Sequence, residues 1–397
     1  MMRTWSRLFV LGAALAGCSS SGTMLGGSSN GGGSSSNGGG SSSNGGGSSS
    51  NGGGSSSNGG GTIAGGGGGG SSSAGGGGTA SGGGGGTSSN GGGGGSALSG
   101  LFVGYYQSWS DSYATSGADT VLAKLPAYVN VVNLAFMQPD TTYVAGSLNI
   151  YGTTFLDVPY DGPTLKDAIT ALHASHPATK ILVSVGGATL YNWAGFQPAK
   201  VAALVNDFGL DGVDVDYEPA TPNCAVANGS VTCPSDAEYI SVIKAMRAAL
   251  PRPKLLSIAG WSVGAYGEDD WATAPPLGSA STGLCLALLH DADASAAIDW
   301  INVMSYDASD AYSPEQALAA YQHYFKGPIA MGIEVPPEAW GGHVETTAEI
   351  DTLGAAVKSA NAAGLMLWSI QKAGPAQQFA TEMCTSLGLA DCASPMM

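Results

Sequence analysis

From Leu101 to the end of the chain, short apolar runs alternate with segments of about ten to fifteen residues that have a helical pattern. The apolar runs are nearly continuous and rich in β-branched and aromatic residues, which is typical of parallel strands buried on both faces. Eight strand-helix units in residues 101–397 predict an α/β protein, a closed (β/α)8 barrel of the TIM type rather than an open sheet. The predicted strands are residues 101–109, 129–137, 180–187, 211–218, 254–261, 300–307, 328–334 and 365–371.

The chain before Leu101 has a different composition. Most of the 65 glycines lie there, and residues 28–61 repeat the seven-residue unit Ser-Ser-Asn-Gly-Gly-Gly-Ser. The unit has no apolar position, so it can neither form a coiled coil nor offset the entropy of ordering the chain. We therefore predict a disordered Gly/Ser/Asn-rich linker over residues 18–100, with an end-to-end distance of roughly 50 Å. Residues 101–397 then form one domain.

The first residues are typical of an export signal. Arg3 and Arg7 precede a short apolar segment, residues 8–16, which is too short to span a bilayer as a helix. Residues 15–18, Leu-Ala-Gly-Cys, resemble a bacterial lipobox, which implies a lipoprotein signal peptide over residues 1–17 and lipidation of Cys18. An ordinary signal peptide with an incidental cysteine is the alternative.

The residue after Cys18 bears on the location of such a lipoprotein. It is Ser19, not the aspartate that retains these proteins in the inner membrane. The resemblance therefore implies an exported protein of the outer membrane or cell surface, which contacts the membrane only through its lipid anchor, or is released as an extracellular protein.

The charge balance excludes several classes of function. The formal net charge is −16 with only 13 Lys plus Arg, so the chain lacks the basic clusters that bind nucleic acid, and a neutral substrate fits better. The five histidines are scattered, and His173 and His176 have no acidic or cysteine partner in the sequence pattern, so we predict no metal site. No GxxxxGK[ST] loop occurs, and we expect no cofactor.

Five cysteines remain when Cys18 is set aside, so at most two disulfides can form within the chain of an exported protein. Two pairs of near neighbours are the easiest to close, Cys224 with Cys233 and Cys384 with Cys392. Cys285 is left over, and we expect a buried helix residue there.

A ladder of carboxylates runs along the fourth predicted strand, residues 211–218. Alternate residues of a strand share a face, so Asp214, Asp216 and Glu218 line up on one side, roughly 7 Å apart. If the intervening apolar residues pack against helices, the three carboxylates point into the barrel and climb toward its C-terminal mouth. Three acids cannot all ionise cheaply in such an interior, so at least one should have a raised pKa or share a proton.

The ladder belongs to a recognisable motif. Asp211, Asp214, Asp216 and Glu218 resemble the D-x-x-D-x-D-x-E signature of family 18 glycoside hydrolases, the chitinases and their relatives. Other motifs of that family also match at the expected strands. They are Ser-Val-Gly-Gly at 184–187, Met-Ser-Tyr-Asp at 304–307, Gly-Tyr-Tyr at 104–106, and Trp368 in the last strand.

The resemblance implies a retaining mechanism in which the substrate's acetamido oxygen replaces a carboxylate nucleophile. Glu218 would be the general acid, Asp216 would stabilise the cyclised intermediate and share a proton with Asp214, and Tyr306 would orient the acetamido group. Asp211, on the opposite face, would fix a turn. Substrate-binding residues would be Tyr105, Trp109, Met304, Asp307 and Trp368.

Tryptophan placement independently favours a sugar ligand, because flat aromatic rings stack on the apolar faces of pyranoses. Six of the eight tryptophans lie within or just beyond the C-terminal ends of predicted strands, although core packing is the alternative for any one of them. These six are Trp109, Trp193, Trp261, Trp271, Trp340 and Trp368.

These expectations converge on a monomeric chitinase acting on chitin or another N-acetylglucosamine-containing polysaccharide. Only 31 positions separate Glu334 from Leu365, and a helix predicted over about 347–362 fills much of that interval. There is no room for the added domain that deepens the cleft of processive relatives, so we expect endo cleavage. The alternatives are an endo-β-N-acetylglucosaminidase acting on N-glycans and, less favoured, a non-catalytic lectin on the same barrel.

Overall fold

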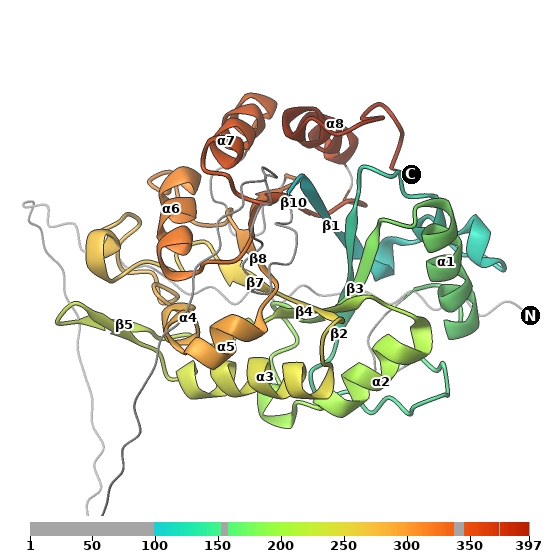
Figure 1. Ribbon diagram of the computed structural model, residues 1–397, viewed down its shortest axis with the longest axis horizontal. Coiled ribbons are helices and arrows are strands. Elements are labelled where there is room, and N and C mark those ends of the chain that lie inside the picture. Colours follow the sequence, from blue (N-terminus) through green and yellow to red (C-terminus); the bar gives the residue numbers. More distant parts are fainter. Residues whose placement is uncertain (1–98, 152–157, 337–344, 373, 397) are drawn as a thin grey trace, which may run out of the picture. The chain divides into compact units, whose positions relative to one another are not determined.

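The computed structural model describes residues 99–151, 158–336, 345–372 and 374–396. The predicted signal peptide, Cys18, the linker up to residue 98 and Trp340 lie outside these residues. Within them, eight parallel strands close into a barrel in the order β1-β10-β9-β8-β7-β4-β3-β2 (Figure 1). The barrel strands are β1 (Leu101–Gln107), β2 (Val131–Met137), β3 (Lys180–Gly186), β4 (Gly212–Asp216), β7 (Leu255–Trp261), β8 (Trp300–Met304), β9 (Ile329–Glu334) and β10 (Gly364–Trp368).

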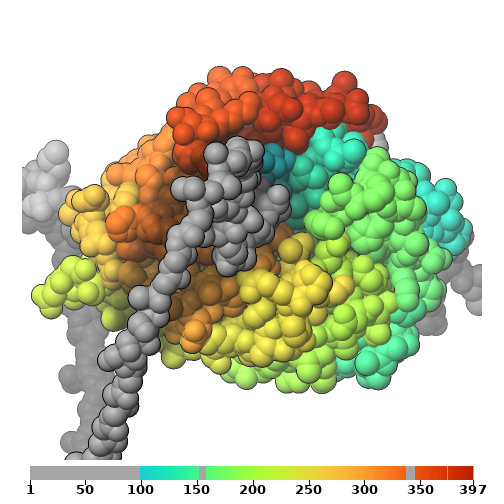
Figure 2. Space-filling view, viewed as in Figure 1, coloured from blue at the N-terminus to red at the C-terminus, as the bar shows by residue number. Residues whose placement is uncertain are grey.

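Closure depends on the pairing of the first and last strands. In β1 and β10, Leu101 pairs with Gly364 and Gly104 with Leu367. In the space-filling view, the red C-terminal segments lie beside the teal segment at the start of the domain (Figure 2). The (β/α)8 prediction is confirmed, and each of the eight predicted strands has an observed counterpart.

Eight α-helices surround the barrel in the described residues (Figure 1). Polar side chains define several of their starts: Asp161 caps the first helix by accepting a bond from the Thr164 N–H, and Thr346 and Glu349 form a reciprocal capping box. The helices are α1 (Gly162–Ser175), α2 (Pro198–Phe208), α3 (Asp236–Ala249), α4 (Leu286–His290), α5 (Ala292–Ala297), α6 (Pro314–Tyr324), α7 (Thr347–Ser359) and α8 (Ala376–Leu387).

The first connection differs from the expected strand-helix unit. Between β1 and β2 the chain forms three single-turn 3-10 helices, η1 (Ser108–Ser110), η2 (Gly117–Asp119) and η3 (Leu122–Lys124), and no α-helix. This segment contains four serines, two aspartates, Gly117 and Pro126, which favour turns over a continuous helix.

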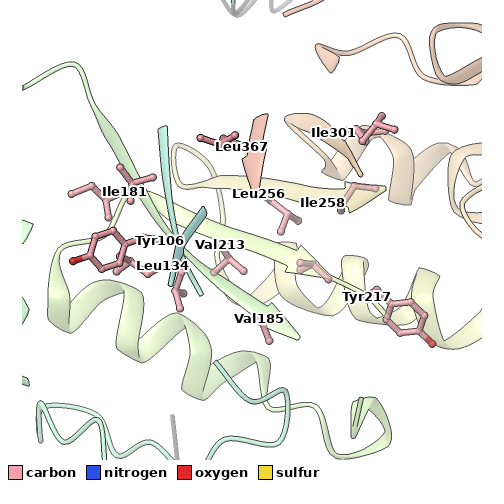
Figure 3. Close-up of a cluster of buried hydrophobic side chains, with 14 of the residues drawn as sticks. Tyr106, Leu134, Ile181, Val185, Val213, Tyr217, Leu256, Ile258, Ile301 and Leu367 are labelled. Atoms are coloured by element: carbon pink, nitrogen blue, oxygen red, sulfur yellow. The ribbon is translucent and has the colours of Figure 1, made fainter. Parts of the chain in front are cut away.

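Apolar side chains divide into two layers on either side of the strands. Val213, Val215 and Tyr217 belong to the large core between strands and helices, where Val213 and Tyr217 lie with Leu134 and Ile258 (Figure 3). A smaller cluster that includes Val103, Tyr105, Trp300 and Met366 fills the barrel interior. Since Val213, Val215 and Tyr217 face the helices, the intervening Asp214 and Asp216 face inward.

An antiparallel hairpin that we did not predict follows the fourth barrel strand. It consists of β5 (Ala225–Ala227) and β6 (Ser230–Thr232), and its turn residues Asn228 and Gly229 have φ values of 53° and 78°. Asn-Gly with positive φ at both positions is the residue pair that a tight hairpin turn favours, so the signal was present in the sequence.

Both predicted disulfides are present. Cys224–Cys233 closes the base of this hairpin, with a Cα–Cα distance of 4.1 Å, and Cys384–Cys392 joins the end of α8 to the C-terminal segment. Cys285 is a buried free thiol, as expected, but it directly precedes α4 rather than lying within a helix.

Asp211 lies at the N-terminal end of β4, at the opposite end of the barrel from Glu218. Its carboxylate accepts bonds from the Ile181 N–H at 2.9 Å and interacts with His173 Nε2 at 3.0 Å. The view that His173 lacks an acidic partner was therefore wrong, because the fold brings β4 beside the end of α1. Asp211 joins these elements and takes no part in the mouth of the barrel.

Several predicted elements were too long. The strand expected over 211–218 ends at Asp216, that expected over 300–307 ends at Met304, and the helix expected to reach 362 ends at Ser359. Glu218, Tyr306 and Asp307 therefore follow their strands rather than belonging to them. In the part of the chain that the structure describes, no helix is long and apolar enough to cross a membrane.

Candidate active site

Asp214 is completely buried in the barrel and is surrounded by groups that can donate hydrogen bonds. Its two carboxylate oxygens contact hydroxyl or amide groups from four other strands. The partners are Tyr105 Oη at 2.8 Å, Ser184 Oγ at 2.8 Å, Ser257 Oγ at 2.5 Å and Asn302 Nδ2 at 3.2 Å. Burial raises the pKa of Asp214, and the four donors oppose this rise. Such a donor set favours an ionised carboxylate.

Asp216, two residues further along β4, is nearly as buried as Asp214 but has fewer hydrogen-bond partners. Its Oδ1 atom is buried without a donor among the described residues. Burial raises the pKa of Asp216 well above its usual range, and the charges of Glu218 and Asp214 raise it further. Of the two inner acids, Asp216 is therefore the one whose surroundings oppose ionisation more strongly.

Glu218 stands two residues beyond the end of β4 and is half-buried. Burial, followed by the charge of Asp307, raises the pKa of Glu218 to about 7. A carboxyl group with such a value carries a proton near neutral pH and can also release it, as a general acid must.

Glycine at the end of β3 allows the backbone to pass close to Asp216. Gly186 has a φ of 107°, and a Cβ there would lie 2.1 Å from the Asp216 carbonyl oxygen and 2.5 Å from Trp193 Cζ2. The N–H of Gly187 donates to that same carbonyl at 2.9 Å. The Ser-Val-Gly-Gly motif thus supplies one donor for Asp214 and fixes the backbone that carries Asp216.

Tyr306 and Asp307 follow β8 on the same rim. A Cβ at Gly332 on β9 would lie 3.0 Å from Tyr306 Cε1, so this glycine leaves room for the tyrosine ring. Burial, then the charges of Glu334 and Asp216, raise the pKa of Tyr306 well above its usual range, so its hydroxyl remains a donor. Asp307 has a φ of 53°, and Met304 is half-buried at the strand's end.

An aromatic wall borders the carboxylates. The Trp368 and Phe136 rings are stacked with their centroids 5.5 Å apart, and Trp109 stacks on Phe136 at 6.2 Å. Tyr105 meets the Trp368 edge at 5.8 Å. Trp109 keeps 43% of its surface exposed. We had not singled out Phe136, because its run reads as an ordinary apolar strand.

The other tryptophans have different surroundings. Trp193 is 3% exposed and packs on Tyr217 in the outer core, so it is a core residue. Trp261 Nε1 donates to the Tyr217 carbonyl at 3.1 Å, and Trp271 packs against His323 and Tyr324. Of the five that the structure describes, Trp109 and Trp368 are members of the aromatic wall.

Sequence reasoning also missed polar residues that complete the site. Ser257 and Asn302 are donors to Asp214, and Glu334 and Lys372 form an ion pair of 2.7 Å beside Asp307. Glu334 could have been found, since it ends an apolar run that predicts a strand. Ser257 and Asn302 are single polar residues inside such runs, and only the closed barrel shows what they face.

Comparisons with known proteins agree with this geometry. Residues 101–332, more than half of the chain, match the family described as Glycosyl hydrolases family 18. The chain is 32% identical over 182 residues to a chitinase from Plasmodium falciparum (isolate 3D7), which covers 42% of this chain and 44% of that protein. It is 29% identical over 256 residues to Chitinase C from Streptomyces lividans, which covers 55% of this chain and 37% of that protein. It thus spans less than half the length of each.

Among solved structures, a family 18 chitinase from Chromobacterium violaceum matches with a TM-score of 0.50 and 17% identity. The match covers 73% of this chain and 84% of that one, and it concerns the fold alone. With the family match over residues 101–332 and the closed parallel barrel, the chain belongs to family 18 of the glycosyl hydrolases.

Proposed function

We propose that this protein is a retaining, endo-acting chitinase that cleaves β-1,4 bonds between N-acetylglucosamine units with Glu218 as general acid and base. The observation that carries the proposal is the row of three carboxyl groups along β4 and just beyond its end, whose hydrogen-bonding surroundings differ. Asp214 has four donors, Asp216 has an unpartnered oxygen, and Glu218 has a pKa of about 7 at the mouth. The curated relatives reported above are named chitinases, which supports the substrate class.

In the proposed first step, Glu218 donates its proton to the glycosidic oxygen as the bond to the anomeric carbon breaks. The acetamido carbonyl oxygen of the same sugar attacks that carbon, so the positive charge moves into an oxazolinium ring. Asp216 accepts the acetamido N–H and stabilises this charge, and the Tyr306 hydroxyl orients the carbonyl oxygen. Glu218, now ionised, then takes a proton from water, which opens the ring with overall retention.

Substrate binding is assigned to the rim. Trp368, Phe136 and Trp109 offer a continuous aromatic surface on which sugar rings can stack. Tyr105 and Met304 belong to the same apolar cluster as Trp368 and Phe136, and we assign sugar contacts to them and to Asp307. Between β9 and β10 the described chain holds α7, and only twelve residues separate Glu334 from the start of that helix. Since this length cannot build a further domain, the proposed groove is open and admits the middle of a polymer.

The proposal includes anchoring of the enzyme through Cys18 at the outer membrane or cell surface. Metabolic labelling with a fatty-acid analogue should tag the full-length protein, and Cys18→Ala should abolish the label while leaving the catalytic domain active. An unlabelled wild-type protein would contradict the lipid anchor without affecting the catalytic proposal.

Glu218→Gln should reduce kcat by at least about 10²-fold, because the amide cannot donate the proton that a general acid supplies. Hydrolysis of a chromogenic chitin oligosaccharide measures this, and circular dichroism checks the fold. Glu315→Gln is the matched control, since Glu315 lies exposed on α6. If Glu218→Gln retained more than about a tenth of the wild-type rate, the assigned role would be wrong.

The pH dependence should show an alkaline limb set by Glu218. The general acid works only when it is protonated, so kcat/KM should fall as pH rises through about 7, the pKa of Glu218 in the free enzyme. Initial rates at low substrate concentration give this profile, and the unfolding temperature at each pH excludes denaturation. A rate that stays constant up to pH about 9 would exclude Glu218 as the acid.

Substrate choice and cleavage mode can be measured together. The viscosity of a soluble chitin derivative should fall well before reducing ends accumulate, and fully deacetylated chitosan should resist cleavage because it lacks the acetamido nucleophile. Release of glycans from a high-mannose glycoprotein in place of these products would identify an endo-β-N-acetylglucosaminidase. Binding without hydrolysis of either substrate would identify a lectin.

A further inference from the structure

Glu334 lies beside the proposed catalytic residues but has no part in the mechanism above. It is the last residue of β9, is only 2% exposed, and pairs in register with Trp368 of β10. A buried carboxyl group at the rim of an active site is unfavourable unless a partner compensates its charge or a proton neutralises it. Its surroundings show how this is done.

One oxygen of Glu334 has a cationic partner. The Lys372 ammonium donates to Oε1 at 2.7 Å, and the lysine side chain is 20% exposed. The other oxygen, Oε2, is buried and has no N–H or O–H donor among the described residues. The remaining neighbour in hydrogen-bonding contact with Glu334 is the carboxyl group of Asp307.

Two carboxyl groups can form a hydrogen bond only when one of them carries a proton, because ionised carboxylates are acceptors alone. Closely spaced acids avoid a second negative charge, so this contact favours a pair that holds one proton and one negative charge. Together the surroundings raise the pKa of Glu334 to about 8: burial raises it most, the Lys372 ammonium opposes this rise, and the Asp307 carboxyl group adds to it.

This carboxyl pair is connected to the catalytic acid. After burial, the charge of Asp307 is the cause that raises the pKa of Glu218. The titratable groups around the pair come from three sides: Asp216 and Glu218 from β4 and its end, Tyr306 from the end of β8, and Lys372 from beyond β10. Any group that fixes the position and charge of Asp307 therefore influences the pKa of Glu218.

We propose that Glu334 and Lys372 are positioning residues: Glu334 holds the Asp307 carboxyl through a shared proton, and Lys372 holds Glu334 and balances the remaining charge. Through this arrangement they set the pH range in which Glu218 is a competent acid. The effect on catalysis rests on the proposed hydrolase activity, whereas the shared proton does not.

The shared proton can be tested on the protein without substrate. In a ¹³C-NMR titration of the side-chain carboxyl groups, several signals should titrate above the usual carboxyl range, and the one that disappears in Glu334→Gln is assigned to Glu334. Lys372→Met should move this titration to higher pH, because a nearby cation is lost, and Lys372→Arg should leave it near the wild-type position. If Glu334 titrates like an exposed glutamate, the proposal fails.

The catalytic consequence is tested by pH profiles of kcat/KM on a chitin oligosaccharide. Lys372→Met should shift the alkaline limb upward by about half a pH unit or more, because removing the cation favours protonated Glu218. Lys372→Arg should restore the wild-type profile. Lys326→Met is the control, since the Lys326 ammonium caps carbonyls at the end of α6. A purely structural role would lower the rate equally at every pH, and an unshifted limb in Lys372→Met would overturn the proposal.

Glu334 has its own pair of variants. Glu334→Gln can still donate an N–H to Asp307 and should keep kcat within a few-fold, whereas Glu334→Leu loses the contact and should lower kcat by about tenfold or more with a smaller change in KM. Equal kcat for the two variants would contradict positioning by hydrogen bond. If the wild-type protein cleaves neither chitin oligosaccharide nor glycoprotein, the proposed function fails, while the NMR titration still decides on the shared proton.

Discussion

The hydrogen-bonding of Asp214 is the constraint on which the site depends. An ionised carboxylate inside a closed barrel is very unfavourable unless donors replace its water. Tyr105, Ser184, Ser257 and Asn302 provide them, and each comes from a different strand. These hydrogen bonds can form only with one register of β1, β3, β4, β7 and β8. The hydrogen bonds of Asp214 therefore also fix where the neighbouring side chains of these strands lie along the barrel axis.

The same strand becomes progressively poorer in donors toward the mouth. Asp214 has four, whereas Asp216 has a buried oxygen with none among the described residues, and its raised pKa follows from burial beside two acids. Glu218 is less buried than either and has a pKa of about 7. One alternating pattern of acids thus gives three carboxyl groups that differ in how easily they ionise, because the surroundings change along the barrel axis while the residue type hardly does.

Much of this arrangement could be predicted from the sequence. The eight strands, the two disulfides and the face shared by Asp214 and Asp216 follow from local rules, since strand period and cysteine spacing are properties of short segments. The ends of the strands could not be predicted, because pairing stops where a neighbouring strand stops. The donors to Asp214 lie far away in the sequence and show no local pattern, and the contact of His173 with Asp211 is likewise a product of closure. The hairpin at Asn228 and Gly229 did have a local signal, because the pair Asn-Gly is typical of a tight hairpin turn.

The carboxyl groups of the site also set a balance between function and stability. A carboxyl group whose pKa is higher in the folded than in the unfolded chain stabilises the fold less as pH rises, because the folded state then binds protons that the unfolded state has released. Glu218 and Glu334 have this property from about their unfolded value of 4.5 up to about 7 and 8. The Lys372 ammonium opposes the effect at Glu334 without removing it. A donor beside Glu218, like those beside Asp214, would stabilise the ionised side chain and the fold, but it would also remove the proton that the proposed reaction requires.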